Sequence, residues 1–552
     1  MEILALKNLS FCYAGESAAA LRGVDLRIGG GEIVLLAGGT GSGKSTLLRL
    51  IKRELAPRGE LGGEIELGGR AISELSGRDA AARVGYVAQR PEEQIVTDRV
   101  YHELAFGAES LGWPPALIRR RVAEVASFFG IDEWFDRPTA ELSGGQRQLL
   151  TVASVMVTDP DVLLLDEPTS RLDPIAAAEL ISAVVRLNRE LGTTLIIAEH
   201  RMEDILPYAD RLIVLDGGRV AVNDTPRRAA AILPQCLPVA DALPAAARLW
   251  RETTEDNIRA AAGECPLSVK EGRRFFAECI GGAGISESYE SPEPQKPQKP
   301  TADPAIELRD VFFRYSRDSE DALRGLCMTV RRGEIYCLLG GNGSGKSTAL
   351  TVAAALRRPY AGSVRILGRR PAAWGEELHG GVLGYLPQEA EMLLLHDSVA
   401  EELASVGLSP RDLPPELQLP ADRHPFDLSG GERELLALAK VLSRRPRILM
   451  LDEPTKGLDA SARAALSSLL CRLRAEGMTI IAVTHDSEFA ADVADRCGFL
   501  FCGELISEGG VREFFSGNAF YTTPAARITR GLAEGIVTVS AAREVIKTEC
   551  GS

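Results

Sequence analysis

Two short stretches of the chain place a small hydroxyl residue and two glycines directly before a segment with helical hydrophobic spacing. They read Leu142-Ser143-Gly144-Gly145-Gln146 and Leu428-Ser429-Gly430-Gly431-Glu432. Glycines ahead of a helix leave main-chain N–H groups able to bind an anion, and the helix dipole adds a positive potential there. Each stretch lies 23 residues before an Asp-Glu-Pro-Thr sequence (143 to 166 and 429 to 452). The repetition predicts two sites for phosphate groups.

Two glycine-rich loops add a second kind of phosphate-binding element. Residues 38–45 and 340–347 both fit the pattern Gly-x-x-x-x-Gly-Lys-Ser. Each loop follows an apolar segment expected to be a strand and precedes a segment expected to be a helix. The glycines let N–H groups wrap a β-phosphate, the lysine neutralises the β- and γ-oxygens, and the serine ligates Mg²⁺. The loops therefore predict two nucleotide sites.

Paired acids end two apolar runs that we expect to be buried strands. They are Asp166-Glu167 and Asp452-Glu453. The aspartates suit a water-mediated hold on Mg²⁺, and the glutamates suit the base that orients an attacking water.

Two further pairs of polar residues follow apolar strands at matching places in both halves. His200 and His485 come about thirty residues after the paired acids, where an imidazole would reach a γ-phosphate. Gln89 and Gln388 occupy positions from which an amide would reach both Mg²⁺ and a partner subunit. A tyrosine near the start of each half would stack on adenine.

These motifs yield three sets of predicted site residues. The predicted catalytic residues are Glu167, Glu453, His200 and His485. The predicted ATP-binding residues are Tyr13, Gly38, Gly39, Thr40, Gly41, Ser42, Gly43, Lys44, Ser45, Thr46, Gln89, Ser143, Gly144, Gly145, Tyr315, Gly340, Gly341, Asn342, Gly343, Ser344, Gly345, Lys346, Ser347, Thr348, Gln388, Ser429, Gly430 and Gly431. The predicted Mg²⁺ ligands are Ser45, Gln89, Asp166, Ser347, Gln388 and Asp452.

The two sets of motifs belong to an internal duplication. Phe11-Cys12-Tyr13 reappears as Phe313-Arg314-Tyr315, and Gly31-Glu32-Ile33 as Gly333-Glu334-Ile335. The offset falls from 302 at the loop lysines (44 to 346) to 286 at the aspartates (166 to 452). Most of this shortening lies between residues 388 and 429, a stretch of 41 residues against 54 between residues 89 and 143. Both stretches have helical patterning and predict a helical insert in an α/β domain.

Composition and charge limit the function classes. With 552 residues, 45% of them hydrophobic and 25% charged, the chain can form two or more globular domains. The formal charge of -14 argues against a protein that coats nucleic acid, because such proteins present a basic face. Ten cysteines without a C-x-x-C pair predict neither a zinc site nor a disulfide framework. No apolar run approaches the roughly 20 residues that a membrane helix needs.

In this order and in duplicate, the motifs resemble the ATPase domains of ABC proteins. The resemblance covers both halves and implies an ATP-hydrolysing enzyme that uses Mg²⁺. It also implies an intramolecular pseudo-dimer with two head-to-tail sites, Lys44 facing Ser429 and Lys346 facing Ser143. Because both halves keep the glutamate and the histidine, we expect neither site to be degenerate.

The resemblance sets the expected fold and domain plan. The expected class is α/β, with two P-loop domains, each a mainly parallel sheet with helices on both faces, an antiparallel β subdomain and a helical insert. The predicted ATPase domains cover residues 1–235 and 305–516. Residues 236–304 are predicted to hold a small helical tail and a flexible linker rich in Pro, Glu and Lys. Residues 517–552 are predicted to form a C-terminal helical tail.

A finer resemblance rests mainly on the first half. Gln89 to Val96, with Glu103 to Gly107, is similar to the energy-coupling factor (ECF) importers and the related cobalt and nickel systems. This implies an energy-coupling subunit for uptake of a vitamin, a vitamin precursor or a metal ion. The implied partners are an integral membrane scaffold and a membrane substrate-binding subunit, which would hold the chain at the cytoplasmic face of the cell membrane. The second half departs from this pattern at residues 388–392.

The segment from Arg90 to Val96 is the predicted docking surface for a membrane subunit. It follows Gln89 and leads into the helical insert, and Glu92, Glu93 and Gln94 offer acceptors to a basic residue.

Soluble translation factors that act on ribosomes form the alternative class, because they also carry tandem domains without membrane spans. Such factors typically have a long charged helical linker and basic surfaces for RNA. Here residues 251–304 hold seven Lys/Arg and ten Asp/Glu, and the net charge is negative. The sequence therefore favours the importer subunit with no nucleic-acid partner, and it does not identify the transported substrate.

Overall fold

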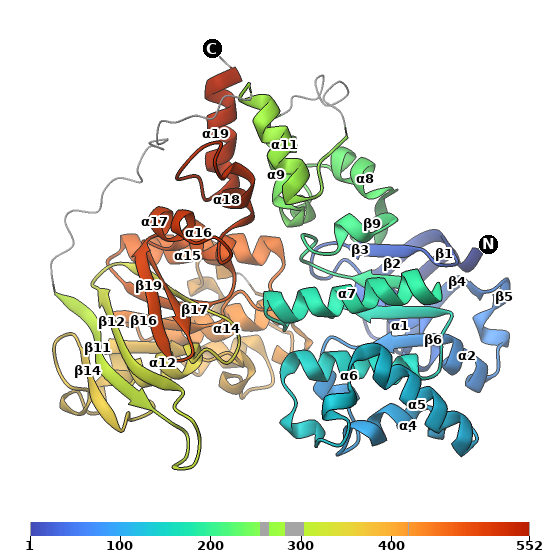
Figure 1. Ribbon diagram of the computed structural model, residues 1–552, viewed down its shortest axis with the longest axis horizontal. Helices are drawn as coiled ribbons and strands as arrows, with labels where there is room; N and C mark the ends of the chain where they lie inside the picture. Colours follow the sequence, from blue (N-terminus) through green and yellow to red (C-terminus); the bar gives the residue numbers. More distant parts are fainter. Residues whose placement is uncertain (1, 254–263, 282–302, 418, 551–552) are drawn as a thin grey trace. The chain divides into compact units, whose positions relative to one another are not determined.

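The structure is a computed structural model that describes residues 2–253, 264–281, 303–417 and 419–550. Two compact units emerge, one formed mainly by residues 2–247 and the other mainly by residues 268–550 (Figure 1). Most of the predicted flexible linker, residues 286–302, lies outside the described residues.

The main sheet of the first unit carries the nucleotide motifs. Its six strands run in the order β10-β9-β3-β8-β7-β6, and all neighbours are parallel except β9 and β10. The strands are β3 (Ile33–Ala37), β6 (Val84–Val87), β7 (Val162–Asp166), β8 (Thr194–Ala198), β9 (Arg211–Asp216) and β10 (Arg219–Asp224). Strands β3, β7 and β8 are buried along their whole length, as parallel strands covered on both faces should be.

A smaller antiparallel sheet and a set of helices complete the first unit. The antiparallel sheet has the order β2-β1-β4-β5, formed by β1 (Glu2–Tyr13), β2 (Ala19–Gly29), β4 (Gly59–Leu67) and β5 (Arg70–Ala71). The helices are α1 (Lys44–Ile51), α2 (Gly77–Arg83), α3 (Pro91–Gln94), α4 (Val100–Ser110), α5 (Pro115–Phe129), α6 (Gly144–Met156), α7 (Pro174–Leu191) and α8 (Pro226–Ile232), with α9 (Ala245–Thr253) following. Helices α4 and α5 lie in the stretch predicted to be a helical insert, and both pack against α6.

The second unit repeats this plan. Its sheets have the orders β12-β11-β14 and β15-β16-β17-β13-β18-β19, with only β18 and β19 antiparallel in the larger one. The strands are β11 (Pro304–Phe313), β12 (Leu323–Arg331), β13 (Ile335–Leu339), β14 (Ala361–Ile366), β15 (Leu383–Leu386), β16 (Ile448–Asp452), β17 (Thr479–Thr484), β18 (Arg496–Phe501) and β19 (Glu504–Gly510). The helices are α11 (Val269–Cys279), α12 (Lys346–Ala353), α13 (Val399–Ala404), α14 (Gly430–Leu442), α15 (Ala460–Ala475), α16 (Ser487–Val493), α17 (Val511–Gly517), α18 (Pro524–Thr529) and α19 (Val539–Cys550). The insert of the second unit is shorter because α13 and short 3-10 turns replace α4 and α5.

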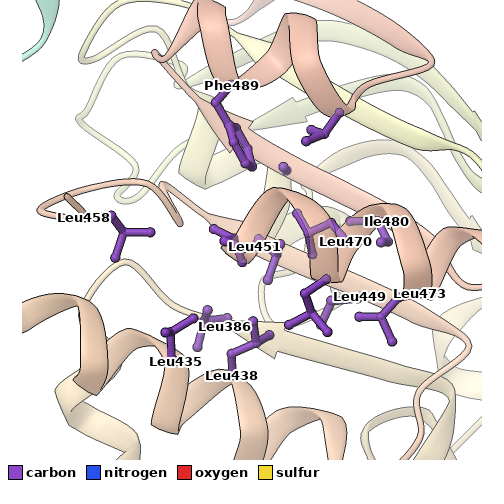
Figure 2. Packing of buried hydrophobic residues seen from close by; sticks show 14 of the residues in the cluster. Leu386, Leu435, Leu438, Leu449, Leu451, Leu458, Leu470, Leu473, Ile480 and Phe489 are labelled. Atoms are coloured by element: carbon purple, nitrogen blue, oxygen red, sulfur yellow. The ribbon is translucent and has the colours of Figure 1, made fainter. Parts of the chain in front are cut away.

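The side chains of β16 alternate between two hydrophobic cores, one on each face of the larger sheet of the second unit. Leu449 and Leu451 belong to a cluster with α14 and α15, seen in Figure 2 beside Leu435 and Leu470. Ile448 and Met450, at the intervening positions, belong to a second cluster with strands β11 and β12. Successive side chains of a strand point to opposite faces of its sheet. Burying one leucine side chain completely stabilises the fold by about 1.5–3 kcal/mol. The sheet that carries the acids is thus fixed from both sides.

The helix between the two repeats packs with the C-terminal tail. Helix α11 contacts α18 and α19, all within the second unit. Both α11 and α19 follow a hydroxyl residue and begin with valine, at Ser268-Val269 and Thr538-Val539. No helix among residues 2–253, 264–281, 303–417 and 419–550 is long and apolar enough to cross a membrane.

Candidate nucleotide-binding sites

Each glycine-rich loop joins the central strand of its sheet to a helix, β3 to α1 and β13 to α12. Gly43 has φ 102°, and a Cβ there would lie 2.8 Å from the carbonyl oxygen of Ala20. Gly345 has φ 98°, and its Cβ would lie 2.5 Å from the carbonyl oxygen of Ala322. A side chain at either position would be both strained and blocked. The two loops therefore share one conformation that requires glycine.

The loop lysines are buried and point back into their own loops. Lys44 Nζ donates to the carbonyl oxygens of Gly38 at 2.8 Å and Gly39 at 3.1 Å. Lys346 Nζ donates to Gly340 and Gly341, both at 2.9 Å. An ammonium group held in the concave side of such a loop is placed to exchange carbonyl oxygens for phosphate oxygens.

The loop serines reach the strand-end aspartates across a long sequence separation. Ser45 Oγ donates to Asp166 Oδ1 at 2.9 Å, and Ser347 Oγ donates to Asp452 Oδ1 at 2.9 Å. Burial raises the pKa of Asp452 to about 6, with the adjacent glutamate adding to the shift. Burial likewise raises the pKa of Asp166. Each pair thus places a hydroxyl and a carboxyl beside the glycine-rich loop. Because the pKa of each carboxyl is raised, the surrounding protein does not fully stabilise its negative charge.

The two predicted bases each contact the predicted histidine. His200 Nε2 lies 2.8 Å from Glu167 Oε1, and His485 Nδ1 lies 2.8 Å from Glu453 Oε2. Burial disfavours the charged form of Glu453 and is the largest single influence, but the hydrogen bonds and charge of His485, together with the charge of Lys346, oppose it and lower the pKa of Glu453. Lys346 Nζ lies 3.7 Å from Glu453 Oε1, so the predicted base and the loop lysine lie in one site.

The amide of Gln89 also reaches the base of the first unit. The Nε2 of Gln89 donates to Glu167 Oε2 at 2.7 Å. The amide oxygen of Gln89, Oε1, is therefore the atom that a metal ion would use. Gln388 occupies the same place after β15 and is exposed. Both glutamate bases have positive φ, 48° at Glu167 and 53° at Glu453, a costly conformation that commonly marks functional residues.

One tyrosine in each unit lies beside the strand-end aspartate, and the sequence motifs did not predict it. Tyr86 OH donates to Asp166 Oδ2 at 3.0 Å, and burial raises the pKa of Tyr86 above its usual range. Tyr385 lies in the same place on β15, and burial and Asp452 raise its pKa. The duplicated Gly-Tyr sequence within these strands is the feature that could have revealed them.

The tyrosines predicted to stack on adenine lie beside the loop helices. Tyr13 OH and Thr46 Oγ1 are 2.8 Å apart, as are Tyr315 OH and Thr348 Oγ1. The guanidinium of Arg357 lies 4.7 Å from the centroid of the Tyr315 ring. Both rings are thus anchored next to the phosphate-binding loops, and their stacking on adenine stays a prediction.

The two serine-glycine stretches, residues 142–146 and 428–432, are termed the signature loops. Ser143 caps α6, accepting from the N–H of Gln146 at 3.2 Å while the Gln146 side chain accepts from the N–H of Ser143 at 3.0 Å. Ser429 caps α14 in the same way with Glu432. A carboxylate serves in this capping box as well as an amide, which explains why the second loop tolerates Glu432.

The segment from Arg90 to Val96 is tied to the signature loop of its own unit. Glu92 Oε1 accepts from Arg147 Nη1 at 3.1 Å, and Arg147 Nε donates to the carbonyl of Leu142 at 3.0 Å. Gln94 turns inward, with Oε1 accepting from the N–H of Ala88 and Nε2 donating to the carbonyl of Tyr86, both at 2.9 Å. Gln94 is therefore engaged within its own loop and is not an outward acceptor, contrary to the sequence-based expectation.

The residues around each aspartate fit a magnesium ion that also binds nucleotide oxygens. Within the described ranges no group of three or more His, Cys, Asp and Glu side chains is arranged to hold a metal. Ser45 with Asp166, and Ser347 with Asp452, offer only hard oxygen donors next to the phosphate-binding loop. Mg²⁺ typically takes one or two protein oxygens together with substrate phosphates, which is the donor set available here.

Both units are similar to proteins of one known family. A family model described as ABC transporter matches residues 21–170 and 323–456. The chain is 36% identical over 537 residues to a Bacillus anthracis protein provisionally named an ABC transporter ATP-binding protein, covering 95% of each chain. It is 38% identical over 564 residues to a Streptomyces coelicolor protein with the same provisional name, covering 95% of this chain and 97% of that one. A solved structure of cbiO1 from Clostridium perfringens, described as part of the ABC transporter complex cbiONQ, is 34% identical with a TM-score of 0.39, covering 42% of this chain and 91% of that one.

Proposed function

The chain belongs to the ABC transporter ATP-binding family and is an ATPase, and from this premise we propose that it is the energy-coupling subunit of a membrane importer. Each unit binds one Mg-ATP at its glycine-rich loop and hydrolyses it. The chain transmits this cycle to an integral membrane scaffold and a membrane substrate-binding subunit at the cytoplasmic face of the membrane, as an ECF-type system does.

The observation that carries the hydrolysis roles is the direct contact between each glutamate base and its histidine. Glu167 is held by His200 and by Gln89, and Glu453 is held by His485. A base held by two donors keeps one orientation, so its carboxylate can align a water with the γ-phosphate. The histidine contacts the γ-phosphate and the glutamate base at once, so binding of the phosphate affects the position of the base.

The remaining side chains bind and orient the triphosphate. Lys44 and Lys346 leave their loop carbonyls and neutralise the β- and γ-oxygens. Ser45 with Asp166, and Ser347 with Asp452, hold Mg²⁺, which when bound neutralises charge that develops on the phosphates. Gln89 and Gln388 complete the metal set. Pairing with a divalent cation also relieves the cost of burying Asp452, whose pKa burial raises to about 6.

Two composite sites form head to tail within one chain. Ser429 completes the site of Lys44, and Ser143 completes the site of Lys346. Supporting this, each signature loop presents an exposed glycine and a capped helix of 13 residues, the geometry that favours an anion. Covalent linkage of the two units raises their effective concentration and favours this closure.

The names of the relatives support a transporter subunit, and the docking segment after Gln89 supports the importer role. Among its acidic side chains, Glu92 is paired with Arg147, whereas Glu93 is 65% exposed and pairs at 3.4 Å with Arg90. Val96, at the end of the segment, is 67% exposed. An exposed carboxylate three residues before an exposed apolar side chain suits a helix of a membrane subunit that carries a basic residue.

Replacing Glu93 by Ala tests the docking role, with Glu60→Ala, at an exposed acid on β4, as the control. Uptake of the substrate by the assembled transporter should fall at least about 10-fold in Glu93→Ala. ATP hydrolysis by the detached chain should stay within about 2-fold, because Glu93 contacts no part of the nucleotide site. Normal uptake would refute docking through Glu93, and an equal loss of detached hydrolysis would assign the segment to the nucleotide site.

A pull-down of the chain from native membranes decides between the importer and the ribosome factor. Recovery of integral membrane subunits supports the importer and identifies the transported substrate through the substrate-binding subunit. Recovery of ribosomes without membrane subunits would overturn the importer role.

A further inference from the structure

A buried glutamate directly precedes the histidine of the first unit. Glu199 follows the end of β8 and is 3% exposed. Its neighbours along β8 are apolar and fully buried. A carboxyl in such a place is costly unless its oxygens are hydrogen-bonded, so its partners indicate what it stabilises.

Both donors to Glu199 come from one residue in the turn after the base. Oε1 of Glu199 accepts from the N–H of Thr169 at 2.9 Å and from Thr169 Oγ1 at 2.7 Å. Thr169 lies two residues after Glu167, whose φ is 48°. The N–H of Glu167 itself donates to the carbonyl of Ala198 at 2.9 Å, immediately before Glu199. The turn that carries the base is thus bonded on both sides to the strand end that carries His200.

The second unit keeps the main-chain bond, from the N–H of Glu453 to the carbonyl of Val483 at 2.8 Å, but it has no carboxylate bonded to the turn at this position. Thr484 stands where the first unit has Glu199, and its hydroxyl accepts from the N–H of Asp486 at 3.0 Å. The matching turn residue, Thr455, has a buried hydroxyl that finds no hydrogen-bond partner among the described residues. The two nucleotide sites therefore differ in how the turn after the base is held, although their motifs are alike.

We propose that Glu199 is a positioning residue of the first ATP site, which holds the turn after Glu167 in place against His200 and makes the two sites unequal in turnover. This inference rests on the proposed role of Glu167 in hydrolysis. Glu199 does not touch the nucleotide, and it acts through Thr169 on the backbone whose strained conformation aims the base.

The positioning depends on the protonation of Glu199. Burial raises the pKa of Glu199 to about 7, hydrogen bonds from Thr169 oppose this shift, and the charges of Glu167 and His200 act on it in opposite directions. An ionised carboxylate accepts stronger hydrogen bonds than a neutral carboxyl. As the pH falls through about 7, Glu199 gains a proton, its grip on Thr169 weakens and hydrolysis at the first site falls.

Two variants of the full-length chain test the proposal, with kcat and KM for ATP measured from pH 5.5 to 9. Glu199→Thr copies the residue of the second unit and should lower kcat at pH 8 by about 3- to 10-fold, with KM within about 2-fold. Glu199→Gln keeps an acceptor for both Thr169 donors but does not titrate. It should retain most of the activity at pH 8 and lose the decline of kcat below pH 7.

Glu103→Gln is the matched control, because Glu103 is also buried and accepts from two main-chain N–H groups and a hydroxyl. Its partners lie ahead of α4 and not in the turn after Glu167, so it should keep the wild-type pH profile. A wild-type kcat in Glu199→Thr, or a wild-type acid decline in Glu199→Gln, would overturn the proposal. A lowered melting temperature with an unchanged pH profile would do the same, since it would mark a merely structural role. Full turnover in Glu167→Gln would instead overturn the proposed hydrolysis function, so the two failures are distinguishable.

Discussion

The imidazole of His200 faces Glu167 through Nε2 at 2.8 Å, whereas that of His485 faces Glu453 through Nδ1 at the same distance. The two rings are therefore turned differently toward their bases. The ring nitrogen on the other side, Nδ1 in one unit and Nε2 in the other, becomes the candidate contact for a γ-phosphate. The same residue types thus form two sites with different internal geometry.

Removing either base should suppress hydrolysis without weakening ATP binding. Glu167→Gln and Glu453→Gln should each lower hydrolysis at their own site by about 10²-fold or more, because the carboxylate acts on the attacking water in the transition state. Steady-state hydrolysis and equilibrium ATP binding, measured on the same preparations, check this. If either variant turned over at the wild-type rate, that unit would hold a regulatory site only.

One chain should bind two nucleotides. Titration with a non-hydrolysable ATP analogue should give two sites per chain, and Lys44→Ala or Lys346→Ala should each reduce this to one. Both lysines are buried in equivalent loops, so neither substitution should affect the other loop's own hydrogen bonds. Calorimetry on the wild type and the two variants provides the measurement, and a clean single site in the wild type would contradict the prediction.

The ion pair between Arg147 and Glu92 should couple the docking segment to the first signature loop. Arg147→Ala should lower hydrolysis more than Glu92→Gln, because Arg147 also donates to the carbonyl of Leu142. A double-mutant cycle should give a coupling energy of about 0.5–1 kcal/mol, since the pair is partly exposed.

The equivalent pair of the second unit, Arg433 and Glu391 at 3.1 Å, is less exposed and should couple more strongly. If the effects of the two substitutions were strictly additive in both units, neither ion pair would couple its docking segment to its signature loop.

Replacing Glu434 by Gln should stabilise the second unit at alkaline pH. Burial raises the pKa of Glu434 to about 8, an effect opposed by Lys456 and supported by two neighbouring carboxylates. Because this pKa lies above that of the unfolded chain, the folded state keeps a proton that the unfolded state loses. Stability therefore falls as the pH rises toward 8. Gln148 occupies the same position in the first unit, so the amide fits there.

Denaturant unfolding at pH 5 and pH 8.5 measures this effect. Glu434→Gln should raise the free energy of unfolding by about 4–5 kcal/mol at pH 8.5 and change it little at pH 5. Gln148→Glu, the reverse exchange in the first unit, should introduce the same loss of stability with rising pH. An equal gain at both pH values would mean that packing, and not ionisation, limits Glu434.

Local motifs were readable from the sequence because their chemistry is local. The loops at 38–45 and 340–347 need glycine at positions of positive φ, and a lysine and serine at fixed spacing. The capping boxes at Ser143 and Ser429 likewise involve residues only three apart. Their repetition predicted the doubled α/β fold, and the two sheets of each unit confirm it.

Side-chain partners that are distant in sequence were decided only by the tertiary structure. Ser45 meets Asp166 because β3 and β7 both flank β8, an order that no local pattern encodes. The inward turn of Gln94 likewise depends on the path of the chain after β6. The residue types and spacings alone predicted that this chain binds and hydrolyses two nucleotides. Strand order and burial decided which donor each buried carboxylate meets. The two sites differ in one such contact, because Glu199 of the first unit accepts from Thr169, whereas Thr484 stands at that position in the second unit.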